Sequence, residues 1–265
     1  MSKFKTTELS DPQFEIGGLR FITVKTPNLK GRGDICVFVP EGEDLHDLPI
    51  VTLMHGVYGS AWIWAMKGGA AQTAERLIRE NQIRAMVLAM PSDGLWGDGS
   101  AYMAHDGYDF EKWIAEDVTA AVRELIPQTS DQSPLFISGL SMGGFGALRV
   151  GAKYAKQYAG ISAHSSITEI RQMKLFVVEP LDHYQQTARL DEDAFTAMVE
   201  NRNDLPPLRF DCGSSDLLID YNRQLHADLD KAGIAHTYEE FEGGHQWEYW
   251  QEHLVDTLLF FDRQI

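Results

Sequence analysis

The chain has 265 residues, of which 44% are hydrophobic and 11% aromatic, so it can bury a large core. Its 23 Lys and Arg against 39 Asp and Glu give a net charge of −16, which argues against nucleic acid or an anionic membrane as a partner. No stretch approaches the ~18 apolar residues of a membrane helix, and the first residues lack the apolar run of an export signal, so we expect a cytoplasmic protein. Cys36 and Cys212 lie in strand-like contexts and are expected to be buried, reduced thiols.

The N-terminal part of the chain predicts a β-hairpin and then a buried strand. Apolar and polar residues alternate over residues 14–24 and 34–39, and Pro, Asn and Gly between them favour a turn. Residues 49–54 form a continuous apolar run of the buried-strand type, which ends at His55 and Gly56.

After this strand the pattern alternates between helix and strand. Helices are expected at residues 68–81, 109–126, 216–232 and 246–261, and strands at 84–90, 158–163, 207–212 and 235–241. This alternation predicts one domain, residues 1–265, with a mostly parallel sheet covered by helices on both faces and the hairpin at one edge. Residues 92–107 form a long loop rich in Gly and Asp that should border the site. Residues 165–205 interrupt the alternation of strand and helix and are expected to form a cap insertion.

Residues 134–148 carry the motif around which the rest is organised. An apolar strand-like run ends in Gly139-Leu140-Ser141-Met142-Gly143, and a small-residue helical segment follows at once. Strand, Gly-x-Ser-x-Gly and helix together are typical of a nucleophile elbow, in which the serine lies on a tight turn above the edge of the sheet. Glycines flank Ser141 because side chains there would collide with neighbouring backbone. We therefore expect Ser141 to be a nucleophile.

A nucleophilic serine needs a base, and the base needs a carboxylate to orient it. His245 follows the last expected strand after two glycines, whereas His55 and His164 come too early for the chain order Ser, acid, His. His226 and His253 fall in expected helices, and His46 and His236 precede or enter strands, at the wrong edge of the sheet. Asp216 follows a strand and precedes His245, so it is the expected acid, with Asp211 and Asp220 as alternatives; it could also cap the next helix.

The remaining site residues are expected around these three. The backbone N–H groups of Val57 and Met142 are the expected oxyanion hole, because one follows His55-Gly56 and the other follows the nucleophile. Aromatic side chains near strand ends could wall a substrate cleft, although such residues are as often plain core. The expected substrate contacts are Tyr58, Trp62, Trp96, His164 and Trp247.

The motifs together resemble one known family. Leu53-Met54-His55-Gly56, the Gly-x-Ser-x-Gly segment, Cys212-Gly213-x-x-Asp216 and Gly243-Gly244-His245-x-Trp247 look like the Putative esterase family of α/β-hydrolases. That family groups esterase D type S-formylglutathione hydrolases, tributyrin esterases, feruloyl and acetyl-xylan esterases and antigen 85 mycolyltransferases. The resemblance implies an α/β-hydrolase fold of about eight strands, a Ser141, Asp216, His245 triad and an oxyanion hole from Val57 and Met142. One departure is Gln246, where many members have Asp.

These observations predict a serine carboxylesterase that acts on a small-molecule or carbohydrate ester, with a short acyl, sugar or phenolic group, through an acyl-enzyme. The same site could serve an acyltransferase, and a binding protein on a hydrolase scaffold is a further alternative. No cofactor and no metal are expected, because the acidic run Asp93, Asp98, Asp106 and Asp109 lacks His ligands at metal spacing. The oligomeric state stays open, with a homo-oligomer possible.

Overall fold

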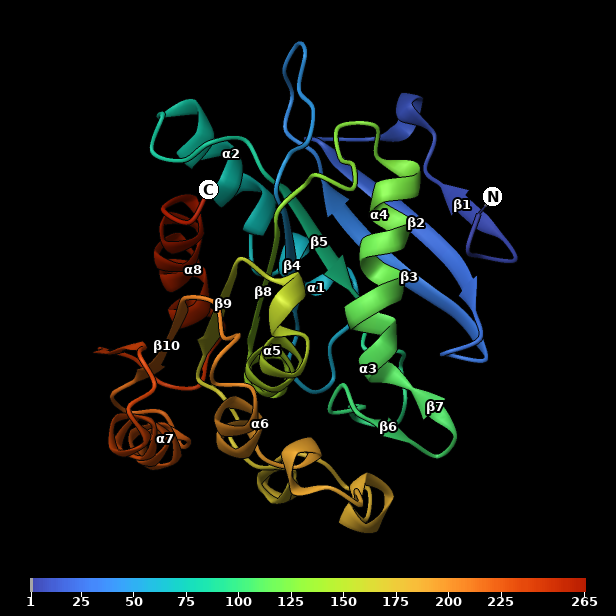
Figure 1. Cartoon of the computed structure of the whole chain (residues 1–265). Coiled ribbons are helices and arrows are strands. Elements are labelled where there is room, and N and C mark those ends of the chain that lie inside the picture. Colours follow the sequence, from blue (N-terminus) through green and yellow to red (C-terminus); the bar gives the residue numbers. More distant parts are fainter. Residues whose placement is uncertain (1) are drawn as a thin grey trace.

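A nine-stranded sheet forms the centre of the protein in the computed structural model, which describes residues 2–265 (Figure 1). The strand order is β1-β2-β3-β5-β4-β8-β9-β10-β11. The strands are β1 (Thr7–Leu9), β2 (Leu19–Thr26), β3 (Gly31–Phe38), β4 (Ile50–Met54), β5 (Val87–Pro91), β8 (Leu135–Leu140), β9 (Gly160–His164), β10 (Leu208–Gly213) and β11 (Thr237–Phe241). From β1 to β5 neighbouring strands are antiparallel, and from β5 to β11 they are parallel.

Helices cover both faces of this sheet. They are α1 (Ile63–Met66), α2 (Ala70–Arg79), α3 (Phe110–Lys112), α4 (Thr119–Leu125), α5 (Met142–Lys153), α6 (Ala194–Glu200), α7 (Ile219–Ala232) and α8 (Trp247–Asp262). A π-helical stretch, η2 (Trp113–Val118), joins α3 to α4, and short 3-10 helices occur at Pro12–Phe14, Ala155–Gln157, Ile170–Leu175, Leu181–Tyr184 and Arg189–Asp191. None of the helices within residues 2–265 is both long and apolar enough to cross a bilayer.

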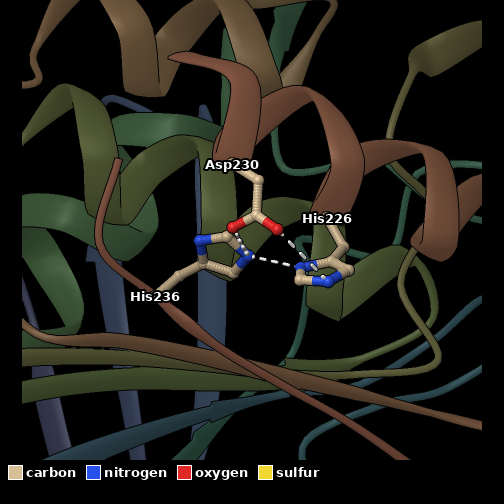
Figure 2. A group of neighbouring side chains, drawn as sticks. All are labelled: His226, Asp230 and His236. Atoms are coloured by element: carbon tan, nitrogen blue, oxygen red, sulfur yellow. Dashed lines mark hydrogen bonds and ion pairs between the residues drawn. The ribbon is translucent and has the colours of Figure 1, made fainter. Parts of the chain in front are cut away.

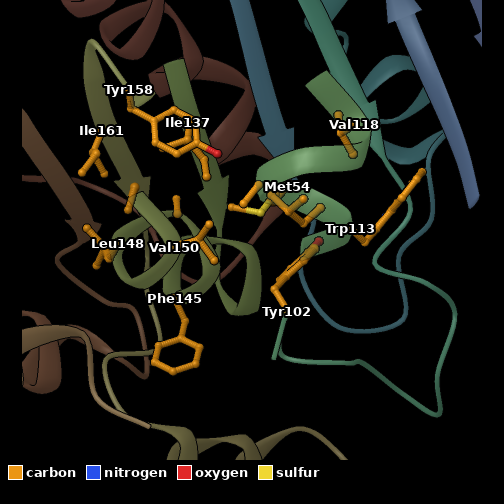
Figure 3. Close-up of a cluster of buried hydrophobic side chains, with 14 of the residues drawn as sticks. Met54, Tyr102, Trp113, Val118, Ile137, Phe145, Leu148, Val150, Tyr158 and Ile161 are labelled. Atoms are coloured by element: carbon orange, nitrogen blue, oxygen red, sulfur yellow. The ribbon is translucent and has the colours of Figure 1, made fainter. Parts of the chain in front are cut away.

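The two faces of the sheet carry separate apolar layers. On one face, α5 packs over β4, β8 and β9, and η2 packs over β5. Figure 3 shows Val150, Ile137 and Ile161 of the first contact and Trp113 and Val118 of η2. On the other face, α2 and α8 cover the opposite side chains of the same strands. Strands buried on both faces explain the continuous apolar runs at residues 49–54 and 134–140. The mostly parallel sheet expected from the sequence is confirmed, with nine strands rather than about eight.

Two features of the helical layer and the sheet edge differ from the sequence prediction. The strand β1 was not expected; it pairs with β2 and accounts for the additional strand. The helix expected over residues 109–126 contains η2, whose wider turn buries the successive residues Trp113, Ile114 and Ala115. The Trp113 indole N–H donates to the Ser92 carbonyl oxygen at 2.7 Å, so the wide turn also ties this helix to the loop after β5.

Residues 165–205 begin directly after β9, at the carboxyl end of the parallel strands. They contain three of the 3-10 helices and α6, which packs against α5 and α7 (Figure 1). Residues 92–107, the other long connection, include part of a small hairpin of β6 (Ala104–His105) and β7 (Tyr108–Asp109). Both segments lie at the end of the sheet where the expected site residues are found.

The last strand, β11, forms one edge of the sheet and carries two ion pairs. Glu239 accepts from Arg209 of β10 at 2.8 Å, and Glu240 accepts from Arg223 of α7 at 2.7 Å. The opposite edge is the three-residue strand β1.

Candidate active site

Ser141 lies on the sharp turn between β8 and α5. Its backbone angles, φ 55° and ψ −118°, are strained for a residue with a side chain. A Cβ on Gly139 would lie 2.3 Å from the Gly143 carbonyl oxygen, and a Cβ on Gly143 would lie 2.4 Å from that of Met54. Only glycine fits either position, which confirms the steric reason given for the motif. The sharp bend between β8 and α5 therefore places Ser141 directly before the first turn of the helix, where backbone N–H groups have no intrahelical acceptor.

The three residues expected to form a triad meet at this turn. Ser141 Oγ lies 2.9 Å from His245 Nε2, and His245 Nδ1 lies 3.0 and 2.9 Å from the two carboxylate oxygens of Asp216. An ionised carboxylate can only accept, so Nδ1–H of His245 donates to Asp216 and Nε2 accepts from the Ser141 hydroxyl. Asp216 is 2% exposed and Ser141 is 1% exposed, so these bonds are shielded from bulk water. This arrangement can pass the serine proton to the imidazole.

The loops after β10 and β11 bring Asp216 and His245 together because these two strands are parallel neighbours. Ser214 N–H donates to the Phe241 carbonyl oxygen and Ser215 N–H to that of Gly243, both at 2.8 Å. A Cβ on Gly213 would lie 2.5 Å from the Gly243 carbonyl oxygen, so the two loops approach too closely for a side chain there.

The rival acids of the sequence analysis lie elsewhere. Asp211 is fully buried, pairs with Arg209 and His164 at 2.9 Å, and accepts from the Tyr249 hydroxyl at 2.8 Å. Burial alone would raise the pKa of Asp211, but His164 and Arg209 outweigh it and hold that pKa below its usual value. Asp220 has a side chain 90% exposed beside Arg223. Asp216 is therefore the carboxylate that reaches His245, and it also accepts from Leu218 N–H at 2.8 Å near the start of α7.

Two backbone N–H groups lie where an oxyanion hole is expected. Met142 begins α5 directly after Ser141, and Gly99 packs between the side chains of Met142 and Val57. Within the described part of the chain, the Val57 N–H has no hydrogen-bond acceptor. A Cβ on Gly56 would lie 3.3 Å from the Cβ of Ser141, so the loop that carries Val57 touches the serine.

His55 holds the Val57 loop rather than taking part in the Ser141 cluster. It is 1% exposed, its Nε2 accepts from Asp93 N–H at 3.1 Å, and its Nδ1–H donates to the Gly56 carbonyl oxygen at 2.6 Å. Asp93 in turn accepts from the backbone N–H groups of Leu95 and Ser100 at 2.9 and 2.7 Å. Neither Asp93 nor Ser100 was expected from the sequence to support the loop that carries Val57, because no local sequence pattern marks these two residues.

A cavity of about 250 Å³ opens beside Ser141 and His245. Its other walls are apolar or aromatic apart from Gln246, and they include two of the expected substrate contacts, Tyr58 and Trp247. The lining is completed by Gly56, Val57, Ile63, Leu140, Phe176 and Trp250. Because these walls supply few polar groups, the cavity suits an apolar part of a ligand rather than a charged one.

Three other expected contacts do not line this cavity. Trp62 is 46% exposed outside it, and Trp96 packs edge-on against His105 and Tyr184 instead. His164 is fully buried beneath the turn, where its carbonyl oxygen accepts from Ser141 N–H at 2.9 Å. The position of a residue after a strand thus predicted which loops lie near the site, but it did not predict the direction in which each side chain points.

Phe176 is a wall residue from the segment expected to form a cap, although it was not among the expected substrate contacts. Its ring stacks on the His245 imidazole with centroids 5.3 Å apart, and its carbonyl oxygen accepts from the Tyr58 hydroxyl. Phe176 belongs to the segment 165–205, which therefore reaches the cavity and contacts the imidazole. An irregular segment without periodicity gave no sign of which residue would point inward.

Fold and site together define an α/β-hydrolase and, within that fold, an ester-hydrolysing serine hydrolase. A family model described as "Putative esterase" matches residues 26–261, so the chain belongs to this family. The family resemblance seen in the motifs is thereby confirmed.

Known relatives agree with this assignment. The chain is 28% identical over 261 residues to an acetyl esterase from Caldicellulosiruptor saccharolyticus, covering 91% of this chain and 90% of that protein. A solved ferulic acid esterase superposes with a TM-score of 0.79 at 21% identity, covering 98% of this chain and 100% of that one. The fluorophosphonate-binding serine hydrolase F of Staphylococcus aureus superposes with a TM-score of 0.78 at 18% identity, covering 91% and 96%. At these identities the two structures show a shared fold.

Proposed function

We propose that the protein is a serine carboxylesterase in which Ser141, His245 and Asp216 form the catalytic triad. The observation that carries this proposal is the continuous hydrogen-bonded chain from Ser141 Oγ through the His245 ring to the Asp216 carboxylate, with distances of 2.9 to 3.0 Å. Such a chain needs no external cofactor to generate a nucleophile.

The reaction proceeds in two halves at this site. His245 Nε2 takes the Ser141 proton as Oγ attacks the ester carbonyl, and Asp216 stabilises the imidazolium and keeps its orientation. The backbone N–H groups of Val57 and Met142 donate to the oxyanion of the tetrahedral intermediate. His245 then gives the proton to the leaving alcohol, and water attacks the acyl-enzyme with His245 again as base, which restores the Ser141 hydroxyl.

Short, uncharged acyl groups are the substrate class that the cavity favours. At about 250 Å³ the cavity is smaller than the roughly 300 to 1,000 Å³ that is usual for sites of drug-sized ligands. The wall residues Ile63, Leu140 and Trp250 suit an acetyl to butyryl chain or one phenolic ring. An acetyl esterase among the relatives supports the short-acyl proposal.

We further propose that residues 165–205 act as a cap on a single hydrolase domain. The backbone N–H of Val178 donates to Asp98 at 3.1 Å, and the N–H of Asp98 donates to Glu179 at 3.0 Å, so the segment is tied to the loop after β5. Together with Phe176 against His245, these bonds hold the segment beside the mouth of the cavity. Substrate choice would then depend on both long loops.

The decisive experiment compares Ser141→Ala with Ser138→Ala. Ser138 is the nearest other serine in the elbow strand, is fully buried, and its hydroxyl has no hydrogen-bond partner within residues 2–265. Turnover of p-nitrophenyl acetate and covalent labelling by a fluorophosphonate should both disappear in Ser141→Ala and persist in Ser138→Ala. Circular dichroism should show both variants folded. Labelling that survives in Ser141→Ala would place the nucleophile elsewhere.

An acyltransferase would use the same acyl-enzyme and is separated by its products. With p-nitrophenyl acetate and a sugar acceptor, an esterase releases acetate in proportion to nitrophenol, whereas a transferase gives acetylated sugar. Acceptor product exceeding free acetate would reassign the protein.

A further inference from the structure

A cluster of two histidines and one aspartate lies at the opposite end of the sheet from Ser141. His226 and Asp230 are four residues apart on α7, and His236 lies just before β11 (Figure 2). Residues i and i+4 of a helix lie on the same face, so both α7 side chains meet the connection that follows the helix. One donor atom from each of the three residues lies within 4.8 Å of the other two.

We propose that His226, Asp230 and His236 bind a divalent transition-metal ion such as Zn²⁺, with water completing its coordination. Two imidazoles and one carboxylate form a donor set that suits zinc, nickel or copper rather than calcium or magnesium, which prefer oxygen ligands. Donor atoms on a tetrahedral zinc ion lie about 3.4 Å apart. His236 Nε2 lies 2.8 Å from His226 Nδ1 and 4.0 Å from a carboxylate oxygen of Asp230, and these two distances lie on either side of that value.

The orientation of His236 is already that of a metal ligand. Its Nδ1–H donates to the Ile234 carbonyl oxygen at 2.8 Å, which leaves Nε2 with a lone pair directed at the cluster. A hydrogen bond from the second ring nitrogen to a carbonyl is the usual support of a ligating histidine. The side chain is 2% exposed and its ring stacks on Phe210 with centroids 5.6 Å apart, so its position is fixed. The His226 and Asp230 side chains are 39% and 64% exposed, so they can adjust to an ion.

The orientation of His236 also fixes the contact between the two rings. Since Nε2 of His236 accepts, Nδ1–H of His226 is the donor in the 2.8 Å contact when no ion is bound. An ion held by His236 Nε2 and His226 Nδ1 would replace that proton, and Nε2–H of the His226 ring would then face an Asp230 carboxylate oxygen 3.6 Å away.

The cluster and the proposed triad lie at opposite ends of β11. His236 comes before the first residue of β11, whereas the loop that carries His245 leaves its last residue. Five residues of strand span about 16 Å. A cavity of about 670 Å³ is lined by His236, Arg202 and Phe260 among others, and the exposed His226 and Asp230 side chains leave the cluster open to solvent. The ion would tie the last turns of α7 to the start of β11.

The test is a calorimetric titration of zinc chloride into protein first treated with a chelator and dialysed. Wild-type protein should bind one equivalent per chain. His226→Asn, at a partly exposed position, should weaken binding at least tenfold, as should His236→Asn. The matched control is His46→Asn, an exposed histidine that should bind zinc like the wild type. Calcium and magnesium should not compete.

A second readout guards against a variant that does not fold. At zinc concentrations a hundredfold above the dissociation constant, the melting temperature of the wild type should rise by about 5 °C or more. The same zinc should leave the melting temperature of His226→Asn unchanged, and this variant should hydrolyse p-nitrophenyl acetate at the wild-type rate. Absence of saturable binding to the wild type, or equal affinity in His226→Asn, would overturn the proposal and leave the cluster as a hydrogen-bonded pair beside a carboxylate.

Discussion

The backbone N–H of Asp93 donates a 3.1 Å hydrogen bond to Nε2 of His55, and this bond decides which ring nitrogen carries the proton. Nδ1–H is therefore free to donate to the Gly56 carbonyl oxygen, one residue before Val57. A single buried imidazole thus joins the end of β4 to the loop after β5 and fixes the peptide group that carries the proposed oxyanion donor, the Val57 N–H.

Replacing His55 by Leu should lower kcat by about tenfold or more while KM changes little. The loss would come from a misplaced Val57 N–H, and removal of a whole oxyanion donor costs about 10² to 10³ in kcat. Steady-state kinetics with p-nitrophenyl acetate measure both parameters. His46→Leu, at an exposed position, serves as the control. An unchanged kcat in His55→Leu would show that the loop keeps its shape without the imidazole.

Replacing Asp216 by Asn should lower kcat by up to about 10⁴-fold, as the analogous change does in serine proteases. Asn offers an amide donor where Nδ1–H of His245 needs an acceptor, so the imidazole is held in the wrong tautomer. Asp220→Asn should have little effect on kcat because that side chain is exposed. Asp211→Asn should reduce stability, because Arg209 would lose a buried partner, with a far smaller loss of kcat in the folded fraction. A larger kcat loss at Asp211 or Asp220 than at Asp216 would contradict the proposed triad.

Replacing Phe176 by Ala should shift acyl-chain preference toward longer chains, because the change removes a wall of the cavity beside His245. The measurement is kcat/KM for p-nitrophenyl acetate, butyrate, hexanoate and octanoate. Val178→Ala is the matched control from the same segment, since Val178 is 89% exposed. If both variants gave the same chain-length profile as the wild type, residues 165–205 would have no role in selectivity.

The buried group around Glu111 should make stability sensitive to acid. Burial alone would raise the pKa of Glu111 above its usual 4.5, but Arg149 and Lys153 outweigh burial and lower it. Because the folded-state pKa is the lower one, the stability that Glu111 contributes is present above pH 4.5 and is lost as pH falls through the folded-state value.

The free energy of unfolding of Glu111→Gln in urea at pH 7 should be lower by about 3 kcal/mol, because the fully buried Arg149 loses its nearest carboxylate and keeps only Asp191, at 3.9 Å. The difference in free energy of unfolding between this variant and the wild type should become smaller as pH falls below 4.5. Glu116→Gln, in the same helical region but with a side chain 41% exposed, should stay within about 1 kcal/mol of wild type. A deficit that stays constant with pH would mean that Glu111 is not ionised in the folded protein.

The elements buried on both faces of the sheet were predictable because local pattern and final environment agree. The runs at residues 49–54 and 134–140 are central strands, and the chain order Ser, acid, His placed Ser141, Asp216 and His245 after β8, β10 and β11, at the same edge of the sheet. Parallel strands bring their carboxyl ends to one edge, so three distant residues could be expected to meet before any geometry was known.

Contacts decided by tertiary packing were not predictable. Trp96 follows a strand as Trp247 does, yet it packs against His105 and Tyr184, and nothing in its neighbours in sequence signals this. Phe176 and His236 owe their positions to an irregular segment and to a helix–strand connection respectively. The π-helical turn at Trp113 could likewise not be predicted from apolar residues spaced every 3.6 positions. A single wide turn buries consecutive residues but leaves the apolar face of the helix as a whole unchanged.

The edges of the sheet bear on how copies of this chain can associate. An unpaired strand edge offers backbone groups to any extended segment that approaches it, and proteins discourage such growth with charge or with very short strands. Here β11 carries Glu239 and Glu240, each held by an arginine, and β1 has only three residues. A neighbouring copy adding a strand to β11 would have to strip water from these ion pairs. Association in register along the sheet is therefore disfavoured, and any dimer should form through helices or loops.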